Sequence, residues 1–297
     1  MKKFNQIKKI LFFLCFLFYI NLLFSKQSIV KIWEDVKNCK AKTQMYVFEP
    51  EDSKKNGIVA IICPGGSYQH LMGIKTEGFD VAQWLNNQGV TACVLKYRVN
   101  KNGYHHPAMI EDLQQSINYV RSNAEKYKIN PNSLCVIGFS AGGHLALMSA
   151  AFYDTNFLEK YNIKPQNLKP NFIAPIYPVV SMQDNICHKR SRKNLLGNKF
   201  NEDKKNKFSM ELQMREDSPP IFLVATEDDP VVDYKNSVEL NKRIENQHIK
   251  NCELHLYKIG GHGFGMDENR GGEAAKWKFE FINWLKNLVE QENSIKE

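Results

Sequence analysis

Ser140 lies in the segment Gly138-Phe139-Ser140-Ala141-Gly142, a spacing that can turn a serine hydroxyl into a nucleophile. A serine is a weak nucleophile unless a histidine takes its proton and a carboxylate orients that histidine. Glycines two residues away on each side are typical of a sharp turn between a strand and a helix, which exposes the hydroxyl. The chemistry therefore depends on finding a histidine and an acid in suitable positions.

His262 has the strongest signal among the eight histidines of the chain. It lies in a glycine-rich segment at 260–265, directly after a strand predicted at 254–257. Glycines allow the backbone to fold closely around one side chain. The other histidines lack this setting. We expect His144 to be structural, inside the helix after the serine, and His255 to lie on the face of a strand.

Three adjacent acids, Glu227, Asp228 and Asp229, follow a strand predicted at 221–226. At most one of them can point at His262, since neighbouring side chains in a turn diverge. An apolar turn and then a helix come directly after Asp229, and this D-x-x-V spacing favours it as the orienting carboxylate. Asp228 is the second candidate.

A further glycine pair, Gly65-Gly66, follows the apolar segment 58–63. Glycines at such a place let a backbone N–H come close to a substrate oxygen and stabilise negative charge that develops there. The residue after the serine supplies a second N–H in turns of this kind. We therefore expect an oxyanion hole formed by Gly65, Gly66 and Ala141.

These residues can meet only in a fold in which several strands end at the same edge of a sheet. Apolar segments of strand length alternate with segments of helical periodicity, which predicts an α/β fold with a doubly wound, mostly parallel sheet flanked by helices. Helices are predicted at 108–127 and 277–288 from the spacing of their apolar residues. We expect a single catalytic domain at 26–297, a length that suits one α/β domain.

In combination these features resemble the α/β-hydrolase superfamily, specifically its secreted carbohydrate-esterase branch of bifunctional feruloyl and acetyl-xylan esterase-like proteins. The resemblance extends from about residue 57 to residue 284. It is carried by CPGGSY at 63–68, EGFDVAQWLNNQG at 77–89, LKYRV at 95–99, HPAMIEDLQQSINYVRSNA at 106–124, GFSAGGHLA at 138–146, YPVVSM at 177–182, NLLG at 194–197, SPPIFLVATEDDPVV at 218–232 and GGHGFG at 260–265. It implies the chain order serine, acid, histidine for a triad of Ser140, Asp229 and His262.

Residues 1–25 have the composition of a signal peptide. Four lysines and no acid precede an apolar segment of about 15 residues at 10–24, and Ser25 offers a small residue for cleavage. Such a segment is shorter than the ~20 residues of a spanning helix. We expect export to the periplasm or the medium; the alternative is an uncleaved membrane anchor.

The net charge and the cysteine spacing limit the ligands and cofactors that we expect the chain to bind. The net charge of +8 would fall to +4 without residues 1–25, which is too mild to indicate nucleic-acid binding. The basic segment 188–207 is expected to be a solvated loop, or else a lid that touches acidic polysaccharide. Neither C-x-x-C nor H-E-x-x-H occurs, so we expect no metal and no cofactor. Buried thiols are expected at Cys63, Cys93 and Cys135, and Cys15 falls in the signal segment; the pairing of Cys39, Cys187 and Cys252 stays open.

The predicted function is hydrolysis of short acyl esters, acetyl or hydroxycinnamoyl, on plant-type polysaccharide such as xylan. Two alternatives remain from the sequence. One is a serine peptidase of the prolyl-oligopeptidase type, which shares the serine turn and the residue order. The other is a non-catalytic carbohydrate-binding or adhesion module on the same fold. Neither a nucleic-acid partner nor stable membrane association after signal cleavage is expected.

Overall fold

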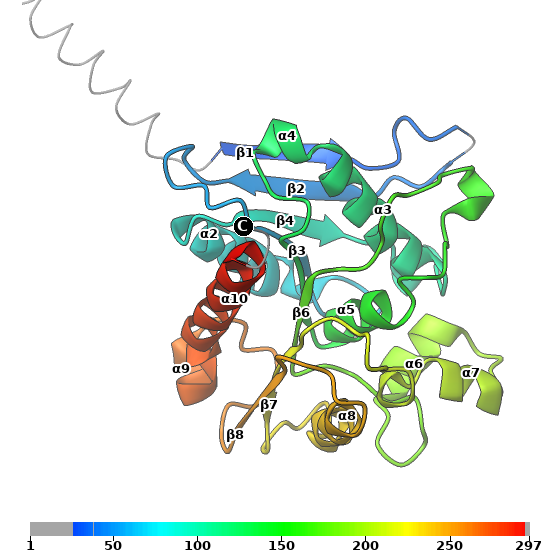
Figure 1. The fold of residues 1–297 in the computed structure, drawn as a ribbon. Coiled ribbons are helices and arrows are strands. Elements are labelled where there is room, and N and C mark those ends of the chain that lie inside the picture. The colour runs from blue at the N-terminus through cyan, green and yellow to red at the C-terminus, as the bar shows by residue number, and fades with distance from the viewer. Residues whose placement is uncertain (1–25, 38, 295–297) are drawn as a thin grey trace, which may run out of the picture.

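The computed structural model describes residues 26–37 and 39–294, and this part of the chain forms an eight-stranded sheet with helices on both faces (Figure 1). The strands are β1 (Lys26–Lys31), β2 (Gln44–Glu49), β3 (Val59–Cys63), β4 (Thr91–Lys96), β5 (Leu134–Phe139), β6 (Phe172–Ile176), β7 (Phe222–Thr226) and β8 (Glu253–Tyr257). The α-helices are α2 (Asp80–Asn87), α3 (Ala108–Ser122), α4 (Ala124–Tyr127), α5 (Ala141–Ala151), α6 (Lys189–Leu196), α7 (Glu202–Lys207), α8 (Lys235–Asn246), α9 (Glu268–Gly271) and α10 (Trp277–Ser294). Shorter helical turns are Met72–Ile74, Lys75–Phe79, Asn100–Asn102, Glu159–Tyr161, Met210–Leu212 and Gly272–Lys276.

The strand order across the sheet is β1-β2-β4-β3-β5-β6-β7-β8. The pairs β1–β2 and β2–β4 are antiparallel, and the pairs from β4 to β8 are parallel. The central strands β3, β5, β6 and β7 are buried along their whole length. Continuous apolar strands are expected where helices cover both faces of a parallel sheet. The predicted doubly wound, mostly parallel architecture is confirmed.

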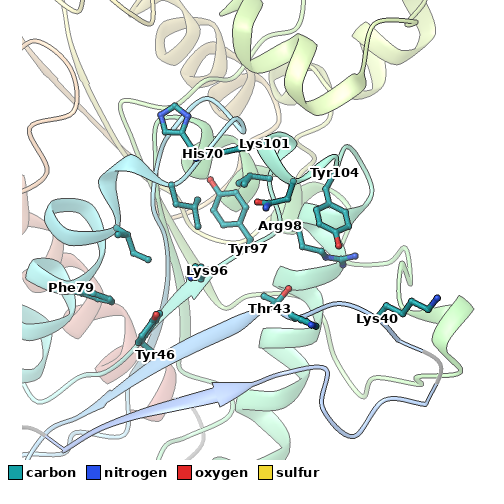
Figure 2. Close-up of a pocket in the computed structure, with 15 residues that line it drawn as sticks. Lys40, Thr43, Tyr46, His70, Phe79, Lys96, Tyr97, Arg98, Lys101 and Tyr104 are labelled. Carbon is teal, nitrogen blue, oxygen red and sulfur yellow. The ribbon is translucent and has the colours of Figure 1, made fainter.

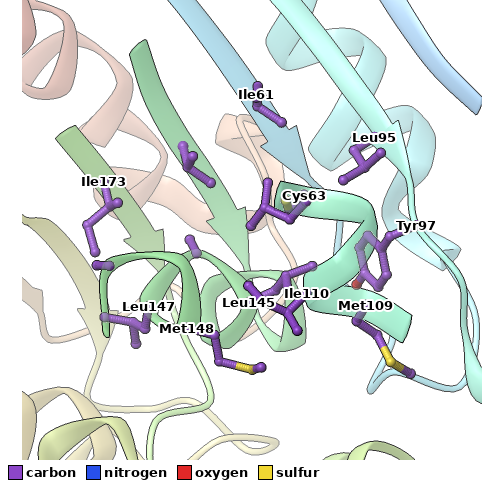
Figure 3. Packing of buried hydrophobic residues seen from close by; sticks show 14 of the residues in the cluster. Ile61, Cys63, Leu95, Tyr97, Met109, Ile110, Leu145, Leu147, Met148 and Ile173 are labelled. Atoms are coloured by element: carbon purple, nitrogen blue, oxygen red, sulfur yellow. The ribbon is translucent and has the colours of Figure 1, made fainter. Parts of the chain in front are cut away.

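Two apolar cores lie on opposite faces of the sheet because successive strand side chains point to opposite sides. Ile61 and Cys63 of β3 belong to the core formed with α3, α5 and α8. Figure 3 shows the part of this core that lies against α3 and α5. Ala60 and Ile62 belong to the other core, formed with α2 and α10. Both faces of the sheet are therefore fixed by packing, and the loops at its carboxyl edge are held by rigid strands.

Two sequence-based expectations about elements differ from the structure. The predicted helix at 108–127 is divided into α3 and α4 at Asn123, whose side chain donates to the carbonyl of Tyr119 at 2.8 Å and competes with the helical backbone pattern. The basic segment 188–207 is not a loop; it contains α6 and α7. Its Lys205 forms ion pairs with Asp184 and Glu202, which stabilise this arrangement.

The cysteines of the described residues are all free thiols. Cys63, Cys93 and Cys135 are buried in strands, as predicted, and burial raises their pKa. Cys15 and the predicted signal peptide at 1–25 lie outside the described residues. Within the described residues, no helix has the length and apolar character needed to cross a bilayer.

Candidate active site

The predicted site residues meet at the carboxyl edge of the parallel strands. Ser140 follows β5, Asp229 lies just beyond β7, His262 follows β8, and Gly66 follows β3. Loops at this edge of an open α/β sheet are where such folds bind ligands. Residues as far apart in the sequence as Gly66 and His262 are thus brought to one place by strand order alone.

Ser140 occupies a sharp turn between β5 and α5. Its backbone has φ 54° and ψ −117°, a conformation rare for a residue with a side chain. The turn leaves no room for a side chain at Gly142, where a Cβ would lie 2.0 Å from the carbonyl oxygen of Cys63. The Ser140 N–H donates to the Ile176 carbonyl at 3.0 Å, which ties the turn to β6. The sequence prediction of a strand, a sharp turn and a helix is confirmed.

A chain of hydrogen bonds joins the serine, the histidine and one acid. Ser140 Oγ lies 2.9 Å from His262 Nε2, and His262 Nδ1 lies 2.6 Å from Asp229 Oδ2. A carboxylate only accepts hydrogen bonds, so Nδ1 carries the proton and Nε2 can accept the serine proton. The Asp229 side chain is 3% exposed and that of His262 is 13% exposed. Ser140 is itself only 6% exposed, so all three residues are largely shielded from solvent.

Asp228 and Asp229 bind different groups. The second oxygen of Asp229, Oδ1, accepts the N–H groups of Val231 and Val232 at 2.8 and 2.9 Å, which fixes the carboxylate toward His262. Asp228 Oδ1 accepts two other N–H groups, those of Gly260 and Gly261, at 3.0 and 2.8 Å. The structure therefore places Asp229 against the histidine and Asp228 against the backbone of the 260–265 loop.

The 64–68 loop differs from expectation at one glycine. The N–H of Gly65 donates to Glu77 Oε2 at 2.7 Å, so it is engaged inside the protein. Among the described residues, the N–H groups of Gly66 and Ala141 donate to no other group. Gly66 has φ +136°, a conformation that a side chain would strain, and a Cβ there would lie 1.9 Å from the carbonyl oxygen of His70. The assignment of Gly65 as an oxyanion donor is corrected, and Gly66 and Ala141 remain.

Glu77 is a buried carboxylate beneath the site that the sequence analysis missed. Its Oε2 accepts the Gly65 N–H, and its Oε1 accepts the hydroxyl of Tyr177 at 3.0 Å. The Tyr177 hydroxyl in turn accepts the N–H of Gly265 at 3.0 Å. Burial raises the pKa of Glu77, while these hydrogen bonds and the charges of His262 and Arg270 oppose the shift. One carboxylate therefore connects the 64–68 loop to the 260–265 loop.

Glu77 and Tyr177 each begin a segment that carries the family resemblance, at 77–89 and 177–182, but neither residue was assigned a role. An acid at the start of a helix is common on protein surfaces. In the structure Tyr177 has φ +37°, and the centroid of its ring lies 4.8 Å from that of His262. Glu77 and Tyr177 are 100 residues apart in the sequence.

His144 and His255 occupy the types of place predicted for them. His144 is fully buried, with Nδ1 2.9 Å from the hydroxyl of Tyr68 and Nε2 2.8 Å from the carbonyl oxygen of Phe208. Burial lowers its pKa to about 4. His255 lies on β8, stacked on Phe222. Their roles are structural contacts within the fold.

A cavity of about 550 Å³ opens beside Asp229. His188, at the start of α6, lines it together with Pro230, Val231 and Tyr234. His188 Nδ1 lies 2.7 Å from Ser191 Oγ, and burial and the charge of His262 lower the pKa of His188. Among the described residues, no group of three or more His, Cys, Asp or Glu side chains is placed to hold a metal ion.

Comparison with known proteins identifies the family and the fold of the chain. A family model described as BD-FAE matches residues 45–244, which include Ser140 and Asp229. The chain belongs to the BD-FAE family. A structure titled as an acetyl ester-xyloside bifunctional hydrolase from Caldicellulosiruptor lactoaceticus has a TM-score of 0.79 and 30% identity, covering 90% of this chain and 98% of that one. The α/β-hydrolase fold of this BD-FAE member is thereby shown.

Two curated relatives of this BD-FAE chain are enzymes of xylan breakdown by name. An acetylxylan esterase of Xylanibacter ruminicola is 32% identical over 257 residues, covering 83% of this chain and 48% of the relative. Endo-1,4-beta-xylanase B of Butyrivibrio fibrisolvens is 28% identical over 221 residues, covering 74% of this chain and 34% of the relative. The chain thus spans half or less of either relative. The acetylxylan esterase and the acetyl ester-xyloside bifunctional hydrolase are ester-cleaving enzymes by name.

Proposed function

We propose that this BD-FAE chain is a serine esterase that removes short acyl groups, acetyl or hydroxycinnamoyl, from plant-type polysaccharide such as xylan. The observation that carries the proposal is the hydrogen-bonded chain from Ser140 Oγ through His262 to Asp229. Two N–H groups, that of Gly66 on the loop after β3 and that of Ala141 directly after the serine, have no internal hydrogen-bond partner among the described residues. The substrate class follows the names of the matched relatives.

In the first half-reaction, the Ser140 oxygen bonds to the ester carbonyl carbon as its proton passes to His262 Nε2. The carbonyl electron pair moves to the oxygen, where the N–H groups of Gly66 and Ala141 stabilise the negative charge. Asp229 stabilises the positive imidazolium and keeps its ring in place. Collapse of the intermediate expels the sugar hydroxyl, which takes the proton from His262.

In the second half-reaction, water replaces the sugar. His262 takes a proton from the water as its oxygen bonds to the acyl carbon, and the carbonyl oxygen again receives the negative charge. Collapse breaks the bond to Ser140 Oγ, which regains a proton from His262, and the carboxylic acid leaves. The 64–68 and 260–265 loops do not need to move between the two steps, since Glu77 and Tyr177 connect them.

Ser140→Ala tests the proposal. The variant should keep the wild-type fold and melting temperature and lose on the order of 10⁴–10⁶ in the rate of p-nitrophenyl acetate hydrolysis. Release of acetate from acetylated xylan and of ferulate from feruloylated arabinoxylan, measured side by side, identifies the acyl group. A variant that keeps a tenth of wild-type turnover would overturn the role of Ser140.

The two alternatives give different results in the same assays. A peptidase of the prolyl-oligopeptidase type would cleave a dipeptidyl chromogenic substrate faster than p-nitrophenyl acetate. A non-catalytic carbohydrate-binding module would bind xylan and hydrolyse neither chromogenic substrate. Esterase activity that disappears with Ser140→Ala excludes both.

We also propose that residues 1–25 are an export signal and that the mature enzyme is periplasmic or secreted. The support is the lysine-rich start followed by a short apolar segment and Ser25. The intact mass of protein recovered from the producing cell tests this. A mass lacking about 25 residues supports export, and full-length protein in the membrane fraction would show an anchor instead.

A further inference from the structure

A second cavity, of about 790 Å³, lies beside the 64–68 loop on the side away from β5 (Figure 2). The end of β4 and the residues after it form one wall, the start of β2 another, and residues 70–79 a third. Its volume is within the usual range for binding sites of small molecules, roughly 300–1,000 Å³. The mechanism proposed above does not use this cavity.

The cavity is lined by uncompensated positive charge. Lys40, Lys42, Lys96 and Lys101 are exposed around it, and none of the four takes part in an ion pair within the described residues. Arg98 differs, because its guanidinium is bound to Glu111 and Asp112 behind the wall, with N–O distances of 3.0 and 2.9 Å. No Asp or Glu lines the cavity along the described part of the chain. Four lysines without an acidic partner around one space favour an anionic ligand.

The walls also suit a sugar ring. Tyr46, Phe79 and Tyr104 contribute aromatic rings to the lining (Figure 2). The rings of Tyr46 and Phe79 pack edge to face with centroids 5.0 Å apart, and the Arg98 guanidinium lies 5.3 Å from the Tyr104 centroid. The parts of these rings that line the cavity can pack against the apolar face of a pyranose. Thr43, which is 3% exposed, has a hydroxyl oxygen with no hydrogen-bond partner in the described structure. A buried polar atom without a partner is costly, and a ligand hydroxyl or carboxylate would satisfy it. Rings, an unpaired hydroxyl and ammonium groups together fit a sugar that carries a carboxylate.

The cavity is physically coupled to the loop at the active site. The Tyr97 hydroxyl, on the cavity wall, donates to the carbonyl oxygen of Pro64 at 2.6 Å. The N–H of Lys101 donates to the carbonyl oxygen of Gln69 at 3.0 Å. His70 lies on the rim, and its pKa is lowered by burial and by the charges of Arg190 and Lys101. Arg190 belongs to α6, and His188, which directly precedes that helix, lines the cavity beside Asp229. The basic rim therefore continues toward the candidate active site.

Sheet order sets the separation of the two sites. The cavity lies over β4, Ser140 follows β5, and only β3 stands between them. Two strand spacings amount to about 10 Å, a distance that a few linked sugar units can bridge. One chain can therefore place an acyl group at Ser140 and another sugar in the cavity.

We propose that this cavity is a subsite for a carboxylate-bearing sugar, a hexuronate, on the same polysaccharide chain whose ester is cleaved at Ser140. The inference rests on the proposed function and extends it from an acylated polysaccharide to an acidic one. The subsite ligands are the ammonium groups of Lys96 and Lys101, with the Thr43 hydroxyl and the Tyr104 ring.

The test compares two acetylated xylo-oligosaccharides of equal length, one with a glucuronate side group and one neutral. Wild type should show a higher kcat/KM for the acidic substrate, and Lys96→Gln/Lys101→Gln should reduce the ratio of acidic to neutral kcat/KM about tenfold, through KM. A tenfold change corresponds to about 1.4 kcal/mol, a reasonable loss for two charge-assisted contacts. Raising the salt concentration should reduce the wild-type ratio in the same direction. The matched control, Lys250→Gln/Lys286→Gln, removes two lysines that do not line the cavity and should keep the wild-type ratio.

Failure of the subsite and failure of the esterase give different results. If wild type hydrolyses p-nitrophenyl acetate but the acidic and neutral substrates have equal kcat/KM, the subsite is overturned and the esterase stands. If wild type hydrolyses none of the esters, the proposed function fails. The subsite is then tested by calorimetry of the binding of both oligosaccharides to Ser140→Ala. Tighter binding of the acidic oligosaccharide that is weakened by Lys96→Gln/Lys101→Gln supports the subsite. Equal binding of the two oligosaccharides overturns the subsite.

Discussion

At the scale of single residues, two adjacent acids take different parts in the site. Asp229 binds His262 through one oxygen and two backbone N–H groups through the other. Asp228 holds the backbone of Gly260 and Gly261 and so shapes the loop that carries the histidine. The two side chains point in different directions. Asp229 binds backbone N–H groups of its own turn after β7, whereas Asp228 binds backbone N–H groups of the loop after β8.

Asp229→Asn should reduce turnover of p-nitrophenyl acetate roughly 10⁴-fold, because an amide at this position favours the wrong tautomer of His262. Asp228→Asn keeps an oxygen that can accept hydrogen bonds from the same two N–H groups, so turnover of p-nitrophenyl acetate by this variant should fall by no more than about tenfold. Steady-state kinetics of both purified variants checks this. A larger loss in Asp228→Asn than in Asp229→Asn would reverse the two roles.

At the scale of elements, the helical turn at Lys75–Phe79 joins two loops of the site. It carries Glu77, which binds the N–H of Gly65 directly and that of Gly265 through Tyr177. The turn thereby sets the direction of the neighbouring Gly66 N–H. Glu77 does not touch the reacting atoms, so it is a positioning residue.

Glu77→Gln should lower kcat about 10- to 100-fold with KM within a few-fold of wild type, as expected for a partly misaligned oxyanion donor. Binding of a boronic acid, which mimics the tetrahedral intermediate, should weaken in parallel with kcat/KM. Both are measured on the same preparation.

Glu49→Gln is the matched control for Glu77→Gln. Glu49 is also a buried acid, paired with Lys55 at 2.9 Å, but it lies at the far end of β2. Glu49→Gln should lower the melting temperature of the protein and leave its affinity for the boronic acid unchanged. If Glu77→Gln behaves in the same way, its role is stability alone.

At the scale of the whole molecule, acid should destabilise the fold through buried histidines. Burial lowers the pKa of His144 and of His106 to about 4. Their ordinary pKa is about 6.5, so the unfolded chain binds more protons between those values. Stability from their neutral forms is present above pH 6.5 and is lost as the pH falls toward 4.

The free energy of unfolding should therefore fall between pH 7 and pH 5, by about 2 kcal/mol from His144 alone. Urea denaturation at the two pH values measures it. His106→Phe should reduce this loss, since the ring packs edge-on against Phe157 and Phe208 and its Nδ1 is buried without a partner in the described residues. An equal free energy of unfolding at both pH values would contradict the assignment.

The sequence by itself determined the features that depend on local backbone geometry. Glycines around Ser140 and the apolar segments before it predict a strand, a sharp turn and a helix, because those residue types restrict φ and ψ and burial locally. The alternation of strand-like and helical segments predicted the mostly parallel sheet, and the resemblance to the α/β-hydrolases implied the order serine, acid, histidine along the chain. It also predicted which cysteines are buried, since strands covered on both faces are apolar throughout.

Tertiary structure alone decided which groups bind each other. The sequence favoured Asp229 over Asp228 as the orienting acid. It could not show that Asp228 binds the loop after β8, or that Glu77 accepts a hydrogen bond from the N–H of Gly65. These are contacts between residues 12 to 100 positions apart, set by strand order and by packing on both faces of the sheet. A hydrogen bond forms where two strand ends bring a donor and an acceptor within about 3 Å, and no local pattern encodes that distance.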